Sequence, residues 1–154
     1  MYRLDHAIKA PSLLASCLAF AISASPSRGD VTQEVLYGML IQDVRASATE
    51  EGGSTRLSFR IENATGRTQI LDAVRSDDAE VGSLLVIDDG VETPAAAGLL
   101  MLDRETLNLG TSHIRVLLHG MMRPLKEGDI VAFEAVFREG TVPAQGHVHA
   151  TINN

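Results

Sequence analysis

Residues 114–129, which read IRVLLHGMMRPLKEGD, decide the fold of this chain. Side chains of a β-strand point to opposite faces with period two. One face of the stretch is therefore apolar and carries Ile114, Val116 and Leu118. The opposite face carries Arg115, Leu117 and His119. The turn predicted at residues 126–129 leads into another strand, so the stretch predicts a strand with one buried face and one face that presents functional groups to solvent.

The rest of the chain after residue 33 shows the same kind of pattern. Residues 56–62 alternate strictly between apolar and polar side chains, and residues 130–137 place alternate apolar side chains on one face. Residues 50–54 (EEGGS) predict a turn, and residues 92–98 predict a loop around Pro94. No segment keeps a period of 3.6 residues, which a helix requires. We therefore predict an all-β fold, either a β-sandwich or a small barrel.

Length and charge limit the possible functions. A chain of 154 residues with 45% apolar residues is long enough for one domain with a substantial core. It contains no tryptophan, so aliphatic side chains must provide most of the packing. The net charge of −7 excludes a general nucleic-acid-binding protein, because such a protein needs a basic face for the phosphates.

Residues 1–24 are typical of a secretory signal peptide, because Arg3 and Lys9 precede an apolar run over residues 10–24. The run is too short for a transmembrane span, so we expect none. A polar segment at residues 25–33 predicts a flexible lead-in. We therefore expect export to the periplasm.

Cys17 is the only cysteine, and it leaves an alternative open. Residues 14–17 (LASC) resemble a lipobox, in which Cys17 would carry a lipid anchor. The apolar run continues past Cys17, which favours ordinary cleavage. The mature chain would then have no cysteine and no disulfide. We assign the sandwich domain to residues 34–145 and a short C-terminal tail to residues 146–154.

No catalytic motif emerges from the sequence. The chain has no G-x-S-x-G elbow, no H-E-x-x-H pair and no phosphate-binding glycine loop. Paired acids at residues 77–78 and 88–89 stand beside turn residues, where carboxylates usually cap the backbone. We therefore do not expect an enzyme.

Histidine and methionine are the remaining candidates for chemistry. Thioethers select Cu(I), and imidazole accompanies them readily. The weak candidates for a metal site are His113, His119, Met121 and Met101. The alternative, favoured by composition, is that the methionines pack a core poor in aromatic residues and the histidines are half exposed.

A separate pair, His147 and His149, lies near the end of the chain. On an extended segment these two imidazoles would point the same way and could chelate Cu(II) or Zn(II). An ordinary polar tail is the favoured alternative, because the sequence supplies no further ligands close by.

Several short motifs follow one another in a definite order along the chain. They are the residues 57–63 strand with its turn, Ile70-Leu71, Ser76, Gly120, residues 124–129, Val131, Phe137 and residues 140–142. This ordered set, over about residues 35–142, resembles the periplasmic copper chaperone PCu(A)C family. The resemblance implies an all-β fold, a cupredoxin-like, Ig-like antiparallel β-sandwich of seven to nine strands. Members of the family bind Cu(I), sometimes Cu(II), and help deliver copper to the Cu(A) centre of cytochrome c oxidase. Its partner would then be a cuproprotein or another copper-delivery protein.

The resemblance also implies where the copper ligands would lie, and this sequence departs from the family there. The family His-x-Met pair falls on Arg115 and Leu117. The early His falls near Gly82 or Ser83, and the middle Met falls near Thr93. Arg115 places a permanent cation where copper would bind.

Two interpretations follow from these replacements. Either the copper site has moved to the weak candidates, or the sandwich has been kept while copper binding was lost. Arg115 favours the loss. A copper-binding and copper-trafficking protein with a degenerate site is our first functional hypothesis. The alternative is a non-metal periplasmic domain that binds a protein partner through Arg115, Leu117 and His119.

Overall fold

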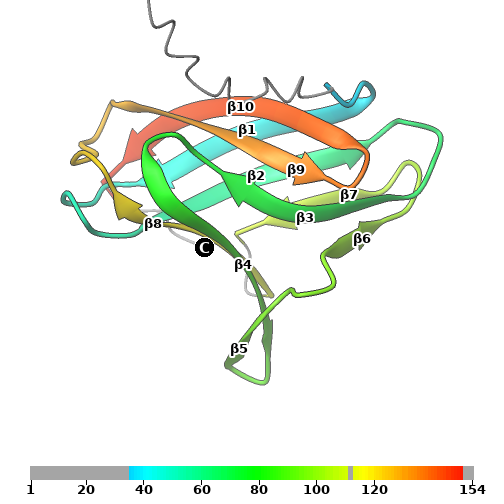
Figure 1. Ribbon diagram of the computed structural model, residues 1–154, viewed down its shortest axis with the longest axis horizontal. Coiled ribbons are helices and arrows are strands. Elements are labelled where there is room, and N and C mark those ends of the chain that lie inside the picture. The colour runs from blue at the N-terminus through cyan, green and yellow to red at the C-terminus, as the bar shows by residue number, and fades with distance from the viewer. Residues whose placement is uncertain (1–34, 111–112, 151–154) are drawn as a thin grey trace, which may run out of the picture. The chain divides into compact units, whose positions relative to one another are not determined.

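The computed structural model describes residues 35–110 and 113–150, which form strands, turns and loops (Figure 1). The signal peptide, Cys17 and the lead-in predicted before residue 34 lie outside the described residues. Within the described part of the chain, there is no helix with the length and apolar character needed to cross a membrane. The all-β prediction is confirmed.

Ten strands follow one another along the chain. They are β1 (Met39–Ser47), β2 (Thr55–Asn63), β3 (Gln69–Arg75), β4 (Ala79–Asp88), β5 (Val91–Pro94), β6 (Leu99–Met101), β7 (Thr106–Leu109), β8 (Ile114–Met121), β9 (Ile130–Phe137) and β10 (Gly140–His149). The sequence predicted seven to nine strands. The additional strand is β5, where we expected a loop around Pro94.

A tight hairpin explains β5. Asp89 and Gly90 both have positive φ angles, 47° and 79°, and an Asp-Gly pair is the preferred sequence of a type I′ turn. The turn pairs β5 with β4 from Asp88 opposite Val91 to Leu85 opposite Pro94. All four residues of β5 are exposed, so no alternation of polarity marks this strand in the sequence.

The strands form one sheet in the order β5-β4-β8-β2-β1-β10-β9-β3-β6, and β7 pairs with β2 outside this order. Neighbouring strands are antiparallel with one exception, the parallel pair β1 and β10, which run side by side with β2 in Figure 1. The sheet folds back on itself where β4 approaches β3. A Cβ atom on Gly82 would lie only 1.8 Å from the carbonyl oxygen of Val74, so only glycine fits this approach.

One core lies between the layers of the folded sheet, and it is mostly aliphatic. β2 and β9 contribute alternate side chains to it, as their sequences predicted. The ring centroids of Phe59 and Phe133 are 5.0 Å apart, a distance typical of a favourable aromatic pair. Leu57, Ile61 and Val131 are completely buried around this pair of strands.

The sequence predicts a last strand from Thr141 towards Ile152, although we assigned residues 146–154 to a tail, and the structure has a strand that continues to His149. Residues 146–149 belong to β10, which pairs with β1 on one side and with β9 on the other. Val148 is buried between two outward-facing histidines, and this burial holds the strand in the sheet. The partner β1 lies about a hundred residues earlier, so no local pattern could indicate the pairing. Residues 151–154 lie outside the described residues.

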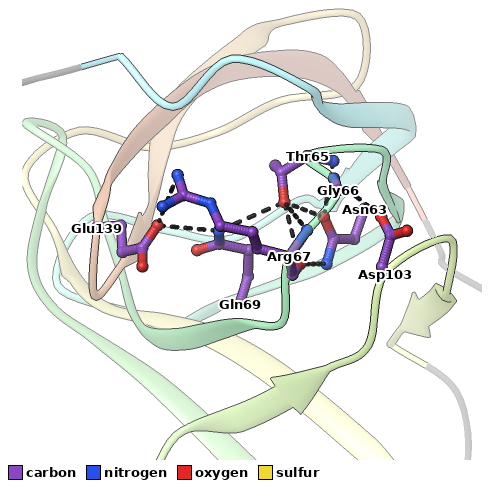
Figure 2. Close-up of polar contacts among 7 residues, drawn as sticks. All are labelled: Asn63, Thr65, Gly66, Arg67, Gln69, Asp103 and Glu139. Carbon is purple, nitrogen blue, oxygen red and sulfur yellow. Dashed lines mark hydrogen bonds and ion pairs between the residues drawn. The ribbon is translucent and has the colours of Figure 1, made fainter.

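A buried asparagine connects two turns at one end of the sandwich (Figure 2). The side-chain amide nitrogen of Asn63 donates to the carbonyl oxygens of Arg67 at 2.8 Å, Leu102 at 3.0 Å and Met101 at 3.3 Å. Its amide oxygen accepts from the backbone nitrogen and the hydroxyl of Thr65 at 3.1 and 2.7 Å. Asn63 therefore ties the turn after β2 to the segment after β6.

The same cluster reaches the turn between β9 and β10. The buried amide nitrogen of Gln69 donates to a carboxylate oxygen of Glu139 at 3.1 Å, and Arg67 forms an ion pair with the same carboxylate at 3.2 Å. Asp103 accepts a hydrogen bond from the backbone nitrogen of Gly66. These contacts, drawn in Figure 2, explain why polar residues are retained at the end of an aliphatic core.

Candidate functional site

β8 has the two faces that its sequence predicted. Val116 and Leu118 are completely buried, whereas the outer face is partly exposed and carries Arg115, Leu117 and His119. β8 lies between β4 and β2 in the sheet, so this outer face continues onto both neighbours. We call the surface formed by Arg115, Leu117, His119 and their outward-facing neighbours on β2, β4 and β5 the β8 face.

The pairing register defines the rows of the β8 face. Leu117 lies directly opposite Ser83 of β4 and opposite Arg56 of β2. Arg115 lies opposite Leu85, which in turn lies opposite Pro94 of β5. Side chains from four strands therefore meet around Arg115 and Leu117.

An ion pair crosses this surface. Arg115 of β8 pairs with Glu92 of β5, and the two side chains reach each other across β4. Both side chains are a little over one-third exposed, at 38% and 39%. The pair therefore ties the β4–β5 hairpin to β8 at the surface.

A second guanidinium lies beside this pair. Arg56 donates a hydrogen bond to the carbonyl oxygen of Gly110 at 2.8 Å. Burial, together with the nearby charge of Arg115, lowers the pKa of Arg56, and Glu92 opposes this effect. The Nε atoms of Arg56 and Arg115 are buried, and neither has a hydrogen-bond partner among the described residues. The centre of the β8 face thus holds two cations and one carboxylate, which disfavours another cation there.

His119 lies at the edge of the β8 face. Its Nδ1 atom is 2.8 Å from the hydroxyl oxygen of Ser54, within hydrogen-bond distance. This contact orients the ring. Ser54 is the only side-chain hydrogen-bond partner of the His119 ring among the described residues.

The structure does not bring the four weak metal candidates together. His113 is exposed at the start of β8, six residues before His119, which corresponds to roughly 20 Å along a strand. Met121 and Met101 are 1% and 0% exposed and belong to the hydrophobic core. Among the described residues, no group of three or more His, Cys, Asp or Glu side chains could hold a metal ion.

Of the positions that the family resemblance implied for copper ligands, those on β4 and β8 are neighbours on the β8 face, whereas Thr93 points to the opposite face of the sheet. Ser83 and Leu117 are directly opposite each other in β4 and β8. Gly82 points toward Val74 and has no room for a side chain, so Ser83 is the outward residue of the two early candidates. Thr93 lies in β5, and its neighbour Glu92 is the residue that pairs with Arg115.

Sequence reasoning placed Arg115, Leu117 and His119 on one face of a strand, as the structure does, but it did not indicate that Glu92, Arg56 and Ser54 lie beside them. Glu92 was missed because it lies in a strand that we expected to be a loop. Arg56 and Ser54 come from β2 and the turn before it, about sixty residues before β8. The alternation of apolar and polar residues in β2 indicated that Arg56 points to solvent. It did not indicate that Arg56 lies beside Leu117 of β8.

Solved structures with a similar fold are copper-chaperone domains. The copper-bound PCuAC domain from PmoF2 matches with a TM-score of 0.63 and 16% identity, over 77% of this chain and 98% of that domain. The apo PCuAC domain from PmoF1 also has a TM-score of 0.63 and 16% identity, over 77% of this chain and 99% of that domain.

The solution structure of CuI-DR1885 from Deinococcus radiodurans matches with a TM-score of 0.61 and 20% identity, over 82% of this chain and 88% of that protein. No protein-family model and no curated protein match the sequence. The resemblance noted from the sequence motifs is therefore confirmed at the level of the fold: the described chain has the cupredoxin-like β-sandwich fold of PCuAC copper-chaperone domains.

Proposed function

We propose that this protein is a periplasmic copper-binding protein of the PCu(A)C chaperone type, which takes part in supplying copper to the Cu(A) centre of cytochrome c oxidase. The observation that carries the proposal is the fold, which this chain shares over most of its length with proteins solved with copper bound. The predicted signal peptide supports the periplasmic location. In this role the protein binds and passes on its cargo and is not an enzyme.

The proposed copper is not held at the ligand positions of the family. Arg115 and Glu92 occupy the surface on which the family places its ligands, and no thioether lies there. A guanidinium remains charged at every physiological pH, so it repels a cuprous ion as it repels any cation. Copper binding must therefore use other side chains.

Copper titration of the purified full chain tests the proposal. Cu(I) is added under reducing conditions against a chromogenic chelator, and Cu(II) is added in air against glycine. We expect one equivalent of copper to resist competition in at least one oxidation state. Arg115→Met serves as the matched variant, and it should bind the same number of equivalents of Cu(I) and of Cu(II) as the wild-type chain. A chain that binds copper in neither oxidation state would contradict the proposal.

Fractionation of cells tests the location. The full chain with a C-terminal tag should be found in the osmotic-shock fraction, shortened by a mass that corresponds to cleavage near residue 24. Intact chain in the cytoplasmic fraction would refute the exported role. Retention of a Cys17-dependent product in membranes would instead indicate the lipid anchor.

A second candidate function is a non-metal domain that binds a protein partner through the β8 face. The Arg115–Glu92 ion pair favours this second function, because it places two charged side chains, and no soft metal ligand, on the surface where they can contact a protein partner. Under this hypothesis Leu117→Asp should abolish cross-linking to the partner in cells. Leu100→Asp is the matched control, since Leu100 is an exposed leucine on β6, the other edge of the sheet. Equal loss in both variants would count against the β8 face.

A further inference from the structure

His147 and His149 lie on one face of β10. His147 is exposed and His149 is partly exposed, whereas Val148 between them is buried in the core. This alternation places both imidazoles on the outer face of the sheet. Residues two apart on a strand have Cα atoms about 6.7 Å apart, a distance that two imidazoles can span to reach one metal ion.

The backbone of the pair is held on both sides. The carbonyl oxygen of His149 accepts from the nitrogen of Ala48 at 3.0 Å, which ties it to the end of β1. Val148 donates to Asp129 at 2.8 Å and accepts from Gly128 at 2.9 Å, which ties the strand to the turn before β9. The backbone of the two histidines is therefore already ordered, so metal binding costs less conformational entropy than it would on a flexible tail.

We infer that His147 and His149 chelate one divalent copper ion. Neutral imidazole is a good ligand for Cu(II), which binds nitrogen ligands more tightly than the other divalent first-row metals. Water completes the coordination, because the described residues provide no third His, Cys, Asp or Glu at this position. A site with two protein ligands and open coordination positions exchanges its ion readily, as a protein that passes copper to a partner requires.

The neighbours of the pair modulate this site. Arg45 of β1 lies directly opposite His147, and its positive charge weakens the binding of a cation. Ser47 lies opposite His149, but its hydroxyl already accepts a hydrogen bond from the backbone nitrogen of Arg56 at 2.9 Å. Ile130 lies opposite His147 on the β9 side and offers no ligand. The two imidazoles are thus the groups that bind copper, and the positive charge of Arg45 lowers the affinity of the site for the ion.

This inference rests on the proposed copper-binding function and locates its ion on β10. The site lies on a different part of the sheet from the β8 face, since β2 and β1 separate β8 from β10. Binding at β10 therefore leaves the β8 face with its Arg115–Glu92 pair free for a partner.

Electron paramagnetic resonance of the full chain loaded with one equivalent of Cu(II), with glycine as competitor, tests the inference. The spectrum of the wild-type chain should show equatorial coupling to two imidazole nitrogens. His147→Ala and His149→Ala should each weaken binding by roughly tenfold or more, and the double variant should lose the bound copper. Arg45→Gln should strengthen binding by roughly two- to fivefold, because it removes a nearby positive charge.

His113→Ala and His119→Ala are the matched controls, and both should bind Cu(II) as the wild type does. Circular dichroism should show the same β-sheet signal for every variant. Copper binding that survives in the double variant, or that is lost in His119→Ala, overturns this site and leaves the proposed function standing. Absence of binding to the wild-type chain in both oxidation states overturns the proposed function as well.

Discussion

Asn63 has a structural role that its turn sequence does not reveal. Its amide nitrogen donates to the carbonyl oxygens of Arg67, Met101 and Leu102, and the side chain is completely buried. Asn63→Ala should lower the free energy of unfolding by about 2–4 kcal/mol, because the side-chain hydrogen bonds that join the turn after β2 to the segment after β6 are lost. Urea unfolding followed by circular dichroism measures this change. Asn108→Ala, at an exposed position of β7, should change it by less than about 0.5 kcal/mol.

The Arg115–Glu92 pair determines the charge of the β8 face more than the stability of the fold. Both side chains are more than one-third exposed, so their coupling energy should be only about 0.5–1 kcal/mol. A double-mutant cycle with Arg115→Gln and Glu92→Gln measures it directly. Of the two single variants, Glu92→Gln should lower the free energy of unfolding more, since it leaves the positive charges of Arg115 and Arg56 close together without a carboxylate between them. A coupling above about 2 kcal/mol would show that the pair is a structural element of the fold.

At the scale of the element, the approach of β4 to β3 depends on Gly82. A methyl group at this position would overlap the carbonyl oxygen of Val74. Gly82→Ala should therefore force the two strands apart and cost about 3 kcal/mol or more, read as a lower midpoint of urea unfolding. Ser83→Ala, one residue further along β4 and outward-facing, is the matched control and should be nearly neutral. If both variants unfold at the same urea concentration, the close approach is not present in solution.

Elements with one buried face could be predicted from the sequence, and elements without one could not. Leu57, Phe59 and Ile61 alternate with polar residues because β2 has core on one side and solvent on the other. The same holds for β8, whose outward residues were identified correctly. β5 has no buried side chain, so only the Asp-Gly turn before it could have indicated a hairpin.

At the scale of the whole molecule, the unpredicted features are contacts between distant segments. The Arg115–Glu92 pair joins β8 to β5 across β4, and no pattern within either strand encodes it. The family resemblance indicated which residues replace the ligands, and the register of β4 and β8 then placed Ser83 opposite Leu117. The sequence predicted a strand at the end of the chain, but it did not indicate that this strand pairs in parallel with β1.

That pairing joins the two halves of the sheet, because β10 lies between β1 and β9. A chain that ends after Gln145 would lose the buried side chain of Val148 and the contacts of β10 with Ala48 and Gly128. We expect this truncated chain to lose several kcal/mol of stability, roughly 3 or more, because an unpaired β1 would expose core residues. A chain that ends after Ala150 keeps every one of these contacts and should unfold at the wild-type temperature. Thermal unfolding of both chains, followed by circular dichroism, gives the comparison. Equal midpoints would mean that residues 146–149 behave as the tail to which we assigned them, and a histidine pair on such a tail would bind copper without the support of the sheet.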